Sequence, residues 1–129
     1  MIGQERGDVV MISSVATDGM GANGSPYNMA KAALEALART LAKEVLRHGI
    51  HVNIVAPGLV ATDMGDRLAK AVTGGRAAAA ADRDATAAFG HVCRPEEVAA
   101  VVRFLVSPAA GYVSGVRIPV NGGGGGLGA

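Results

Sequence analysis

Two apolar segments separated by a long helix-forming segment limit the folds available to this chain. Residues 9–12 are a continuous run of apolar, β-forming residues, residues 50–56 are a second apolar segment, and Ala and Leu are frequent between them. Continuous apolar runs, as opposed to alternating ones, are typical of strands buried on both faces of a parallel sheet. This order predicts an α/β protein with about three strands and connecting helices, with residues 115–120 as the third strand.

One long helix is predicted between the first two strands. Ser25 is expected as its N-cap and Pro26 as its first helical residue, and its body runs from Tyr27 to about His48. Apolar residues at helical spacing predict its inward face: Tyr27, Ala30, Leu34, Leu37, Leu41 and Val45. Glu35 and Arg39 are expected to form a pair four residues apart, contributing ~0.2–0.5 kcal/mol.

The start of this helix places a tyrosine and a lysine close to a serine that ends the first strand. Tyr27 and Lys31 are expected on one helix face, with Ser14 shortly before them. An ammonium group favours a nearby phenolate, and a serine hydroxyl can hydrogen-bond a carbonyl or alkoxide oxygen. Together these groups suit proton transfer on an oxygen whose carbon gains or loses a hydride. Singly, such a tyrosine is more often a packing residue and such a serine a turn residue.

The spacing of these residues resembles the short-chain dehydrogenase/reductase family, in particular its 3-oxoacyl-reductase-like subgroup. The matching features are Ser14, Tyr27 thirteen residues later, Lys31 four residues beyond, the segment 52–58 that ends in Pro-Gly, and Thr62. The set as a whole is far more specific than any one of these features alone.

The resemblance implies the C-terminal half of a larger fold. It covers residues 7–66 closely and residues 94–123 well, whereas the family's Gly-rich phosphate loop has no counterpart in the chain. We therefore expect residues 1–129 to form a single partial domain, the C-terminal catalytic half of a Rossmann-type, doubly wound parallel sheet. A chain shortened in this way would lack the cradle for the adenine and pyrophosphate of its cofactor, so its activity alone is left open.

The resemblance also implies an activity and the residues for it. It implies hydride transfer between NAD or NADP and an alcohol or ketone, with Tyr27 as the proton donor or acceptor. Lys31 would stabilise the Tyr27 phenolate and bind the nicotinamide ribose, and Ser14 would hydrogen-bond the substrate oxygen. Besides Tyr27 and Lys31, the expected cofactor-binding residues are Pro57, Gly58, Val60 and Thr62. The partners implied are a small carbonyl or alcohol substrate and a second copy of the chain, in a homo-oligomer.

Two other interpretations remain open. The chain can be read as a non-catalytic remnant that associates through the helix 27–48 and an open strand edge at residues 9–12. Alternatively, Gly19-x-Gly21-x-x-Gly24 fits the dinucleotide fingerprint. We disfavour that role because residues 15–18 separate these glycines from the strand, whereas the fingerprint needs them in the strand-to-helix turn itself.

The remaining segments give weaker predictions. A helix with an apolar face is expected to start near Arg94 and end before Ser107. Residues 61–90 are the poorest region, with low complexity over 74–81, and the Gly-rich tail 122–129 is expected to be disordered.

Composition limits the partners and the compartment. The net charge is +1, and nothing in the charge pattern favours nucleic acid or an anionic membrane as a partner. No leader and no run of the ~18 apolar residues of a membrane span is seen, so a cytoplasmic protein is expected. Cys93 is the single cysteine and is expected to be inert. The three histidines lack ligand spacing, so no metal site is predicted.

Overall fold

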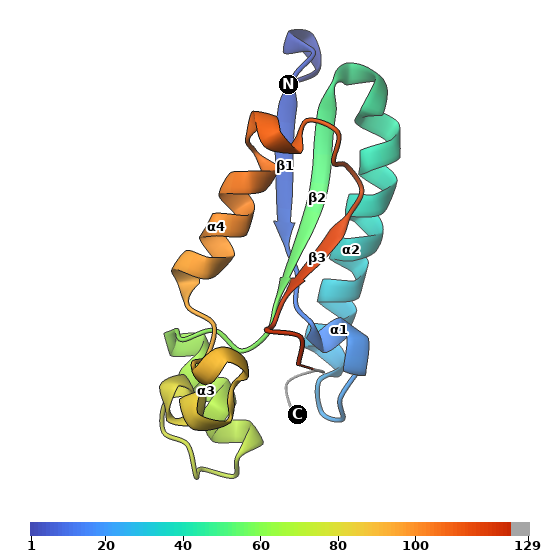
Figure 1. Cartoon of the computed structure of the whole chain (residues 1–129). Helices are drawn as coiled ribbons and strands as arrows, with labels where there is room; N and C mark the ends of the chain where they lie inside the picture. The colour runs from blue at the N-terminus through green and yellow to red at the C-terminus, as the bar shows by residue number, and fades with distance from the viewer. Residues whose placement is uncertain (125–129) are drawn as a thin grey trace.

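Three parallel strands form one sheet in the order β1-β2-β3. The computed structural model describes residues 1–124, in which β1 is Gly7–Ile12, β2 is Ile50–Pro57 and β3 is Arg117–Val120 (Figure 1). The predicted α/β class with a parallel sheet is confirmed. The third strand begins two residues later than predicted, although Gly115 already donates its backbone N–H to Val52, at 2.8 Å.

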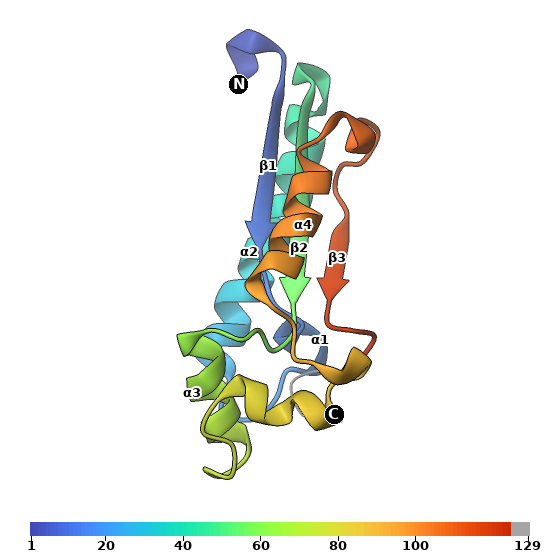
Figure 2. The ribbon, with the colours of Figure 1, turned by 60° about the vertical axis from the view of Figure 1, so that its left-hand side comes forward.

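Helices cover both faces of this sheet. The helix α2, Ser25–Val45, continues as a 3-10 turn, Leu46–His48, and packs on one face, whereas α4, Pro95–Leu105, packs on the other (Figures 1 and 2). Two further helices, α1 and α3, lie near the carboxyl ends of the strands, with bounds Ala16–Gly19 and Asp63–Val72. Within residues 1–124, no helix is both long and apolar enough to cross a bilayer.

Short 3-10 segments complete the chain. They are η1, Ile2–Gln4, before β1; η3 and η4, Ala80–Thr86 and Ala88–Gly90, after α3; and η5, Pro108–Ala110, after α4. Most of the low-complexity residues 74–81 thus lie between α3 and η3, and the last two begin η3. Of the tail 122–129, residues 122–124 turn the chain after β3, and residues 125–129 lie outside the described part, so the predicted disorder stays a prediction.

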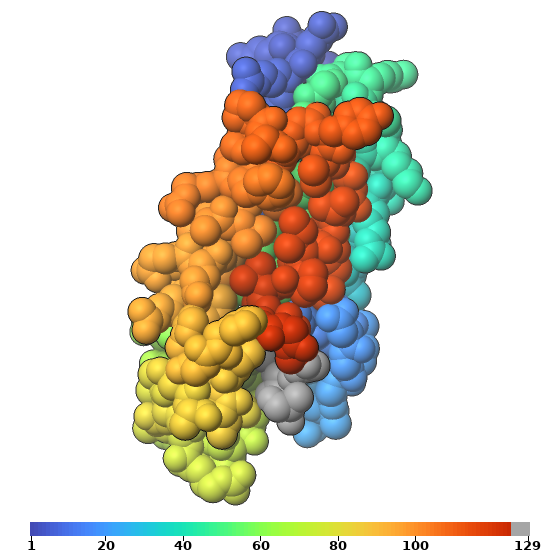
Figure 3. Space-filling view, in the orientation of Figure 1, coloured from blue at the N-terminus to red at the C-terminus, as the bar shows by residue number. Residues whose placement is uncertain are grey.

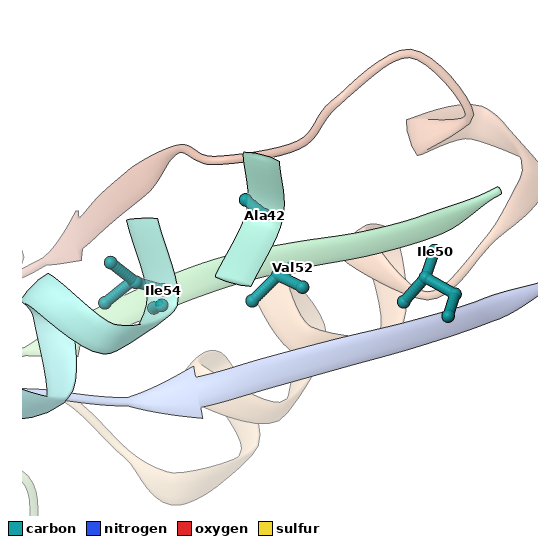
Figure 4. Packing of buried hydrophobic residues seen from close by; sticks show 5 residues of the cluster. Ala42, Ile50, Val52 and Ile54 are labelled. Atoms are coloured by element: carbon teal, nitrogen blue, oxygen red, sulfur yellow. The ribbon is translucent and has the colours of Figure 1, made fainter. Parts of the chain in front are cut away.

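The core lies between β2 and α2. Ile50, Val52 and Ile54 of β2 are at most 4% exposed and face Ala38 and Ala42 of the helix (Figure 4). The two alanines let the helix approach the strand closely, and the central position of β2 buries its other face under α4. In the described sheet β1 has β2 as its only neighbour, which agrees with the open edge predicted for this strand.

The predicted inward face of α2 is partly wrong. Its buried residues are Asn28, Glu35, Ala38 and Ala42, whereas three of the predicted inward residues are exposed, namely Tyr27, Ala30 and Leu37. The helix is rotated by about one residue relative to the prediction, because two polar side chains lie on the buried side and apolar spacing does not include them. The predicted N-cap is also wrong: Gly24 occupies that position, and Ser25 is the first helical residue.

Candidate functional site

Ser14 lies in the short connection between the end of β1 and the start of α1. Its neighbours Ser13 and Val15 donate their backbone N–H groups to Val55 and Pro57 of β2, at 2.7 and 3.0 Å, so the pairing continues past the end of β1. The Ser14 side chain is buried, and its Oγ accepts the backbone N–H of Ala16 at 3.1 Å. Ser14 therefore acts as a turn residue and still has its O–H group as a donor.

Tyr27 and Lys31 lie on one side of α2, beside the carboxyl end of β1. The Lys31 Nζ is 5.7 Å from the centroid of the Tyr27 ring and donates a hydrogen bond to the backbone oxygen of Ile12 at 2.9 Å. The Tyr27 side chain is 43% exposed, so its phenol is accessible from outside. The sheet edge and the helix start thus bring the amine and the phenol to the same region as the strand that leads to Ser14.

The turn after β2 contains the other residues expected to bind a cofactor. Pro57 ends the strand, and Gly58 donates its N–H to Val120 at 3.0 Å. Val60 forms a parallel bridge with Cys93, and Thr62 is the N-cap of α3, where its Oγ1 accepts the N–H of Gly65 at 3.1 Å. These contacts fix the turn at the carboxyl edge of the sheet, where open α/β sheets bind ligands.

A cleft of about 420 Å³ opens at the carboxyl ends of β2 and β3. Of the predicted site residues only Gly58 lines it; Ser14, Tyr27 and Lys31 do not, although Val15 does. Its outer wall is the segment after α3, which packs against the turn that follows β3: Figure 3 shows the yellow segment beside the dark red one. The sequence named no individual residue of this wall as a site residue.

Two titratable residues that line the cleft, His91 and Cys93, have pKa values shifted by the same carboxylate, that of Glu97. His91 Nε2 donates to Glu97 Oε1 at 2.9 Å, and this hydrogen bond raises the pKa of His91. Burial raises the pKa of the Cys93 thiol, and the nearby Glu97 carboxylate adds to this effect. A thiol in this state is a weak nucleophile, in agreement with the inert cysteine expected from the sequence. No cluster of three or more metal-ligating side chains occurs among residues 1–124.

The predicted pair of Glu35 and Arg39 is present, with Arg39 Nη2 3.5 Å from Glu35 Oε2. Glu35 also has partners that the sequence did not predict, and it is only 7% exposed. Its Oε1 accepts hydrogen bonds from Ser13 Oγ at 2.6 Å, Arg117 Nε at 2.9 Å and Thr17 Oγ1 at 3.0 Å. Burial opposes ionisation, but the hydrogen bonds from these three donors hold the pKa of Glu35 below its ordinary value.

Glu35 should make the stability of the chain depend on pH. Because its pKa is lowered in the folded state, its stabilising contribution is fully present above the pKa of the unfolded chain and is lost as the pH falls through the folded value. Urea unfolding between neutral pH and about pH 3 should show this loss. Glu35→Gln should flatten this part of the profile, whereas Glu44→Gln, at an exposed site on the same helix, should leave it unchanged. Equal profiles for Glu35→Gln and the unsubstituted chain would contradict the assignment.

The glycines of the fingerprint-like segment do not form a strand-to-helix turn. Gly19 ends α1, Gly24 is the N-cap of α2, and Met20 between them has a positive φ of 45°. Residues 13–18, which include most of α1, separate this segment from β1, in agreement with the expectation that residues 15–18 intervene. A pyrophosphate-binding role for these glycines is therefore not favoured by their position.

Comparisons of sequence find similarity to proteins described as reductases. A family model described as enoyl-(acyl carrier protein) reductase matches residues 1–124. The short-chain reductase protein NovJ of Streptomyces niveus is 41% identical over 93% of this chain and 45% of its own length. The 3-oxoacyl-[acyl-carrier-protein] reductase FabG of Pseudomonas aeruginosa is 40% identical over 91% and 44%. The chain thus spans less than half the length of these relatives.

Solved structures of two reductases and a dehydrogenase are also similar to this chain. Levodione reductase superposes with a TM-score of 0.84 at 34% identity, covering 95% of this chain and 48% of that one. A 7α-hydroxysteroid dehydrogenase complexed with NADH and 7-oxo glycochenodeoxycholic acid gives 0.83 at 28% identity, over 98% and 48%. YwfH, an NADPH-dependent reductase, gives 0.83 at 29% identity, over 95% and 48%.

Proposed function

As this chain belongs to the short-chain dehydrogenase/reductase family, we propose that it is the catalytic half of an oxidoreductase that transfers a hydride between NAD or NADP and a carbonyl or alcohol substrate. A substrate of the 3-oxoacyl type is the finer form of this proposal, by similarity to FabG. Because the chain spans less than half of its relatives, an adenine and pyrophosphate site would have to come from outside the described residues.

The proposal depends most on the arrangement of Lys31 and Tyr27. Lys31 has three N–H groups and uses one on Ile12, so others are available for the hydroxyls of a nicotinamide ribose. The same ammonium group lies 5.7 Å from the centroid of the Tyr27 ring, so the two side chains can approach one ligand together. These residues therefore fit a nicotinamide cofactor, whose chemistry would be to give or take the hydride.

The chain's own residues would manage the substrate oxygen. Tyr27 would donate its phenolic proton to that oxygen during reduction and accept it back during oxidation, while Lys31 stabilises the phenolate between the two events. The Ser14 hydroxyl would donate a hydrogen bond to the same oxygen and orient it toward Tyr27. Pro57, Gly58, Val60 and Thr62 would line the nicotinamide side, at the edge of the sheet.

Titration of the chain with NADH and with NADPH tests this proposal. We expect weak but saturable binding, followed by fluorescence or calorimetry, because the proposed nicotinamide contacts would be available while residues 1–124 supply no phosphate loop. Lys31→Ala should weaken it about tenfold through the loss of a charged hydrogen bond. Lys43→Ala, an exposed residue in the last turn of α2, is the matched control and should change nothing. A folded chain that binds neither nucleotide would contradict the proposal.

A non-catalytic role in association is the second candidate. It is supported by the free edge of β1 in the described sheet and by the exposed apolar side chains of α2, among them Met29 at 70% and Leu37 at 57%. A homo-oligomer would cover such a face in either case. Concentration-dependent association in sedimentation experiments without nucleotide binding would favour this second role, whereas association with binding would support an oligomeric oxidoreductase.

A further inference from the structure

The guanidinium of Arg117 joins the last strand to the segment around Ser14. Its Nε donates to Glu35 at 2.9 Å, and its Nη2 donates to the backbone oxygen of Ser14 at 3.2 Å and to Thr17 Oγ1 at 3.1 Å. The same Nη2 lies 3.0 Å from a carboxylate oxygen of Asp18. The Arg117 side chain therefore connects the buried Glu35 carboxylate of α2 to the backbone oxygen of Ser14.

Glu35 reaches the same segment from the helix side. It accepts the hydroxyl of Ser13, the residue directly before Ser14, and Thr17 Oγ1 lies within hydrogen-bond distance of both Glu35, at 3.0 Å, and the Ser14 backbone oxygen, at 2.9 Å. The segment from Ser13 to Asp18 is thus attached to α2 and to β3 by charged hydrogen bonds, in addition to its backbone pairing with β2. Such bonds are shorter and stronger than neutral ones.

We propose that Glu35 and Arg117 are positioning residues for Ser14: their ion pair fixes the main chain on both sides of the serine and so fixes the direction of its hydroxyl. The inference rests on the proposed function for the role of Ser14, because an oriented hydroxyl matters only if it meets a substrate oxygen. Arg117 suits this task better than a lysine would, since a guanidinium presents several N–H donors in one fixed plane.

The structure supplies a local reporter of this positioning. The backbone N–H of Ala16 bonds to Ser14 Oγ at 3.1 Å, and the N–H of Val15 bonds to Pro57 at 3.0 Å. The N–H of Ile54, which bonds to Val116 at 2.8 Å, lies in the central strand and reports on the fold as a whole. Amide hydrogen exchange distinguishes local from global opening, because each amide exchanges through the least costly opening that exposes it.

The test compares exchange rates by NMR in the full 129-residue chain and its variants. Glu35→Gln and Arg117→Lys should each raise exchange at Val15 and Ala16 by about tenfold or more relative to Ile54, the loss expected for a charged hydrogen bond. The matched control is Arg39→Gln: Arg39 contacts Glu35, but among residues 1–124 no hydrogen bond or ion pair joins it to the serine segment, so the ratio should stay unchanged. Equal acceleration at Ile54 and at the serine segment, or no acceleration there, would overturn the proposal.

If Glu35→Gln and Arg117→Lys fail to fold, Thr17→Val provides the same test. It removes only the hydroxyl that meets Ser14, Glu35 and Arg117, and it should raise the same ratio in a folded chain; an unchanged ratio overturns the proposal. The measurement needs neither cofactor nor turnover. Failure of the proposed function would show as absent nucleotide binding with the exchange ratios as expected, so the two failures are distinguishable.

Discussion

A Tyr27→Phe variant is expected to lose about 10²- to 10⁴-fold of turnover while keeping its fold. The substitution removes the one group that would exchange a proton with the substrate oxygen. The ring stays, and at 43% exposure the loss of the phenolic oxygen leaves no buried group without a partner. The measurement is the rate of NADH or NADPH oxidation with a ketone, in a preparation of the chain that turns over.

The chain offers a matched control for this experiment. Tyr112 is the only other tyrosine, is fully exposed and lies in the turn after η5, away from Ser14 and Lys31. Tyr112→Phe should therefore retain full turnover. Tyr27→Phe should still bind nucleotide measurably, because Lys31 and the aromatic ring remain and the proton matters to the chemical step. Near-full turnover of Tyr27→Phe would end the assignment of Tyr27 as the proton donor.

Sequence patterns within single strands and helices predicted the fold well. The apolar segment at residues 50–56 predicted the second strand, and β2 is buried on both faces because β1 and β3 flank it and α2 and α4 cover it. The similar run at residues 9–12 lies at the edge of the described sheet, where the pattern would equally suit a strand with a further neighbour. The short helix α3 was not predicted, because alanine and glycine at residues 61–90 give no periodic signal.

Contacts between distant elements could not be predicted from such patterns. Glu35 and Arg117 are 82 residues apart, and each has an ordinary local explanation: an exposed helix charge and a polar residue in an edge strand. Their pairing follows only from the sheet order, which places β3 beside β2 and near the start of α1. Likewise the spacing of Ser14, Tyr27 and Lys31 predicted a shared location, but the cleft beside them is built by residues 83–93, whose sequence is uninformative.

Gly65→Ala is expected to lower the free energy of unfolding by about 3 kcal/mol, the upper end of the usual cost of overpacking. A Cβ at this buried position would overlap the backbone oxygen of Val60. Val60 cannot easily retreat, because it is bridged to Cys93 and the next N–H, that of Ala61, also bonds to Cys93, at 2.9 Å. Since alanine is intrinsically about 1 kcal/mol better than glycine in a helix, any loss measured in urea is attributable to this overlap.

The same substitution links the fold to the proposed cofactor site. Val60 is expected to meet the nicotinamide, so a turn displaced by Gly65→Ala should also weaken the binding of NADH and NADPH. Gly21→Ala is the control: a Cβ there meets nothing within 4 Å, so stability and binding should both be retained. Loss of binding in folded Gly21→Ala would instead favour a nucleotide loop at Gly19 to Gly24. A Gly65→Ala chain as stable as Gly21→Ala would show that the turn after β2 is free to move, contrary to its fixed position in the structure.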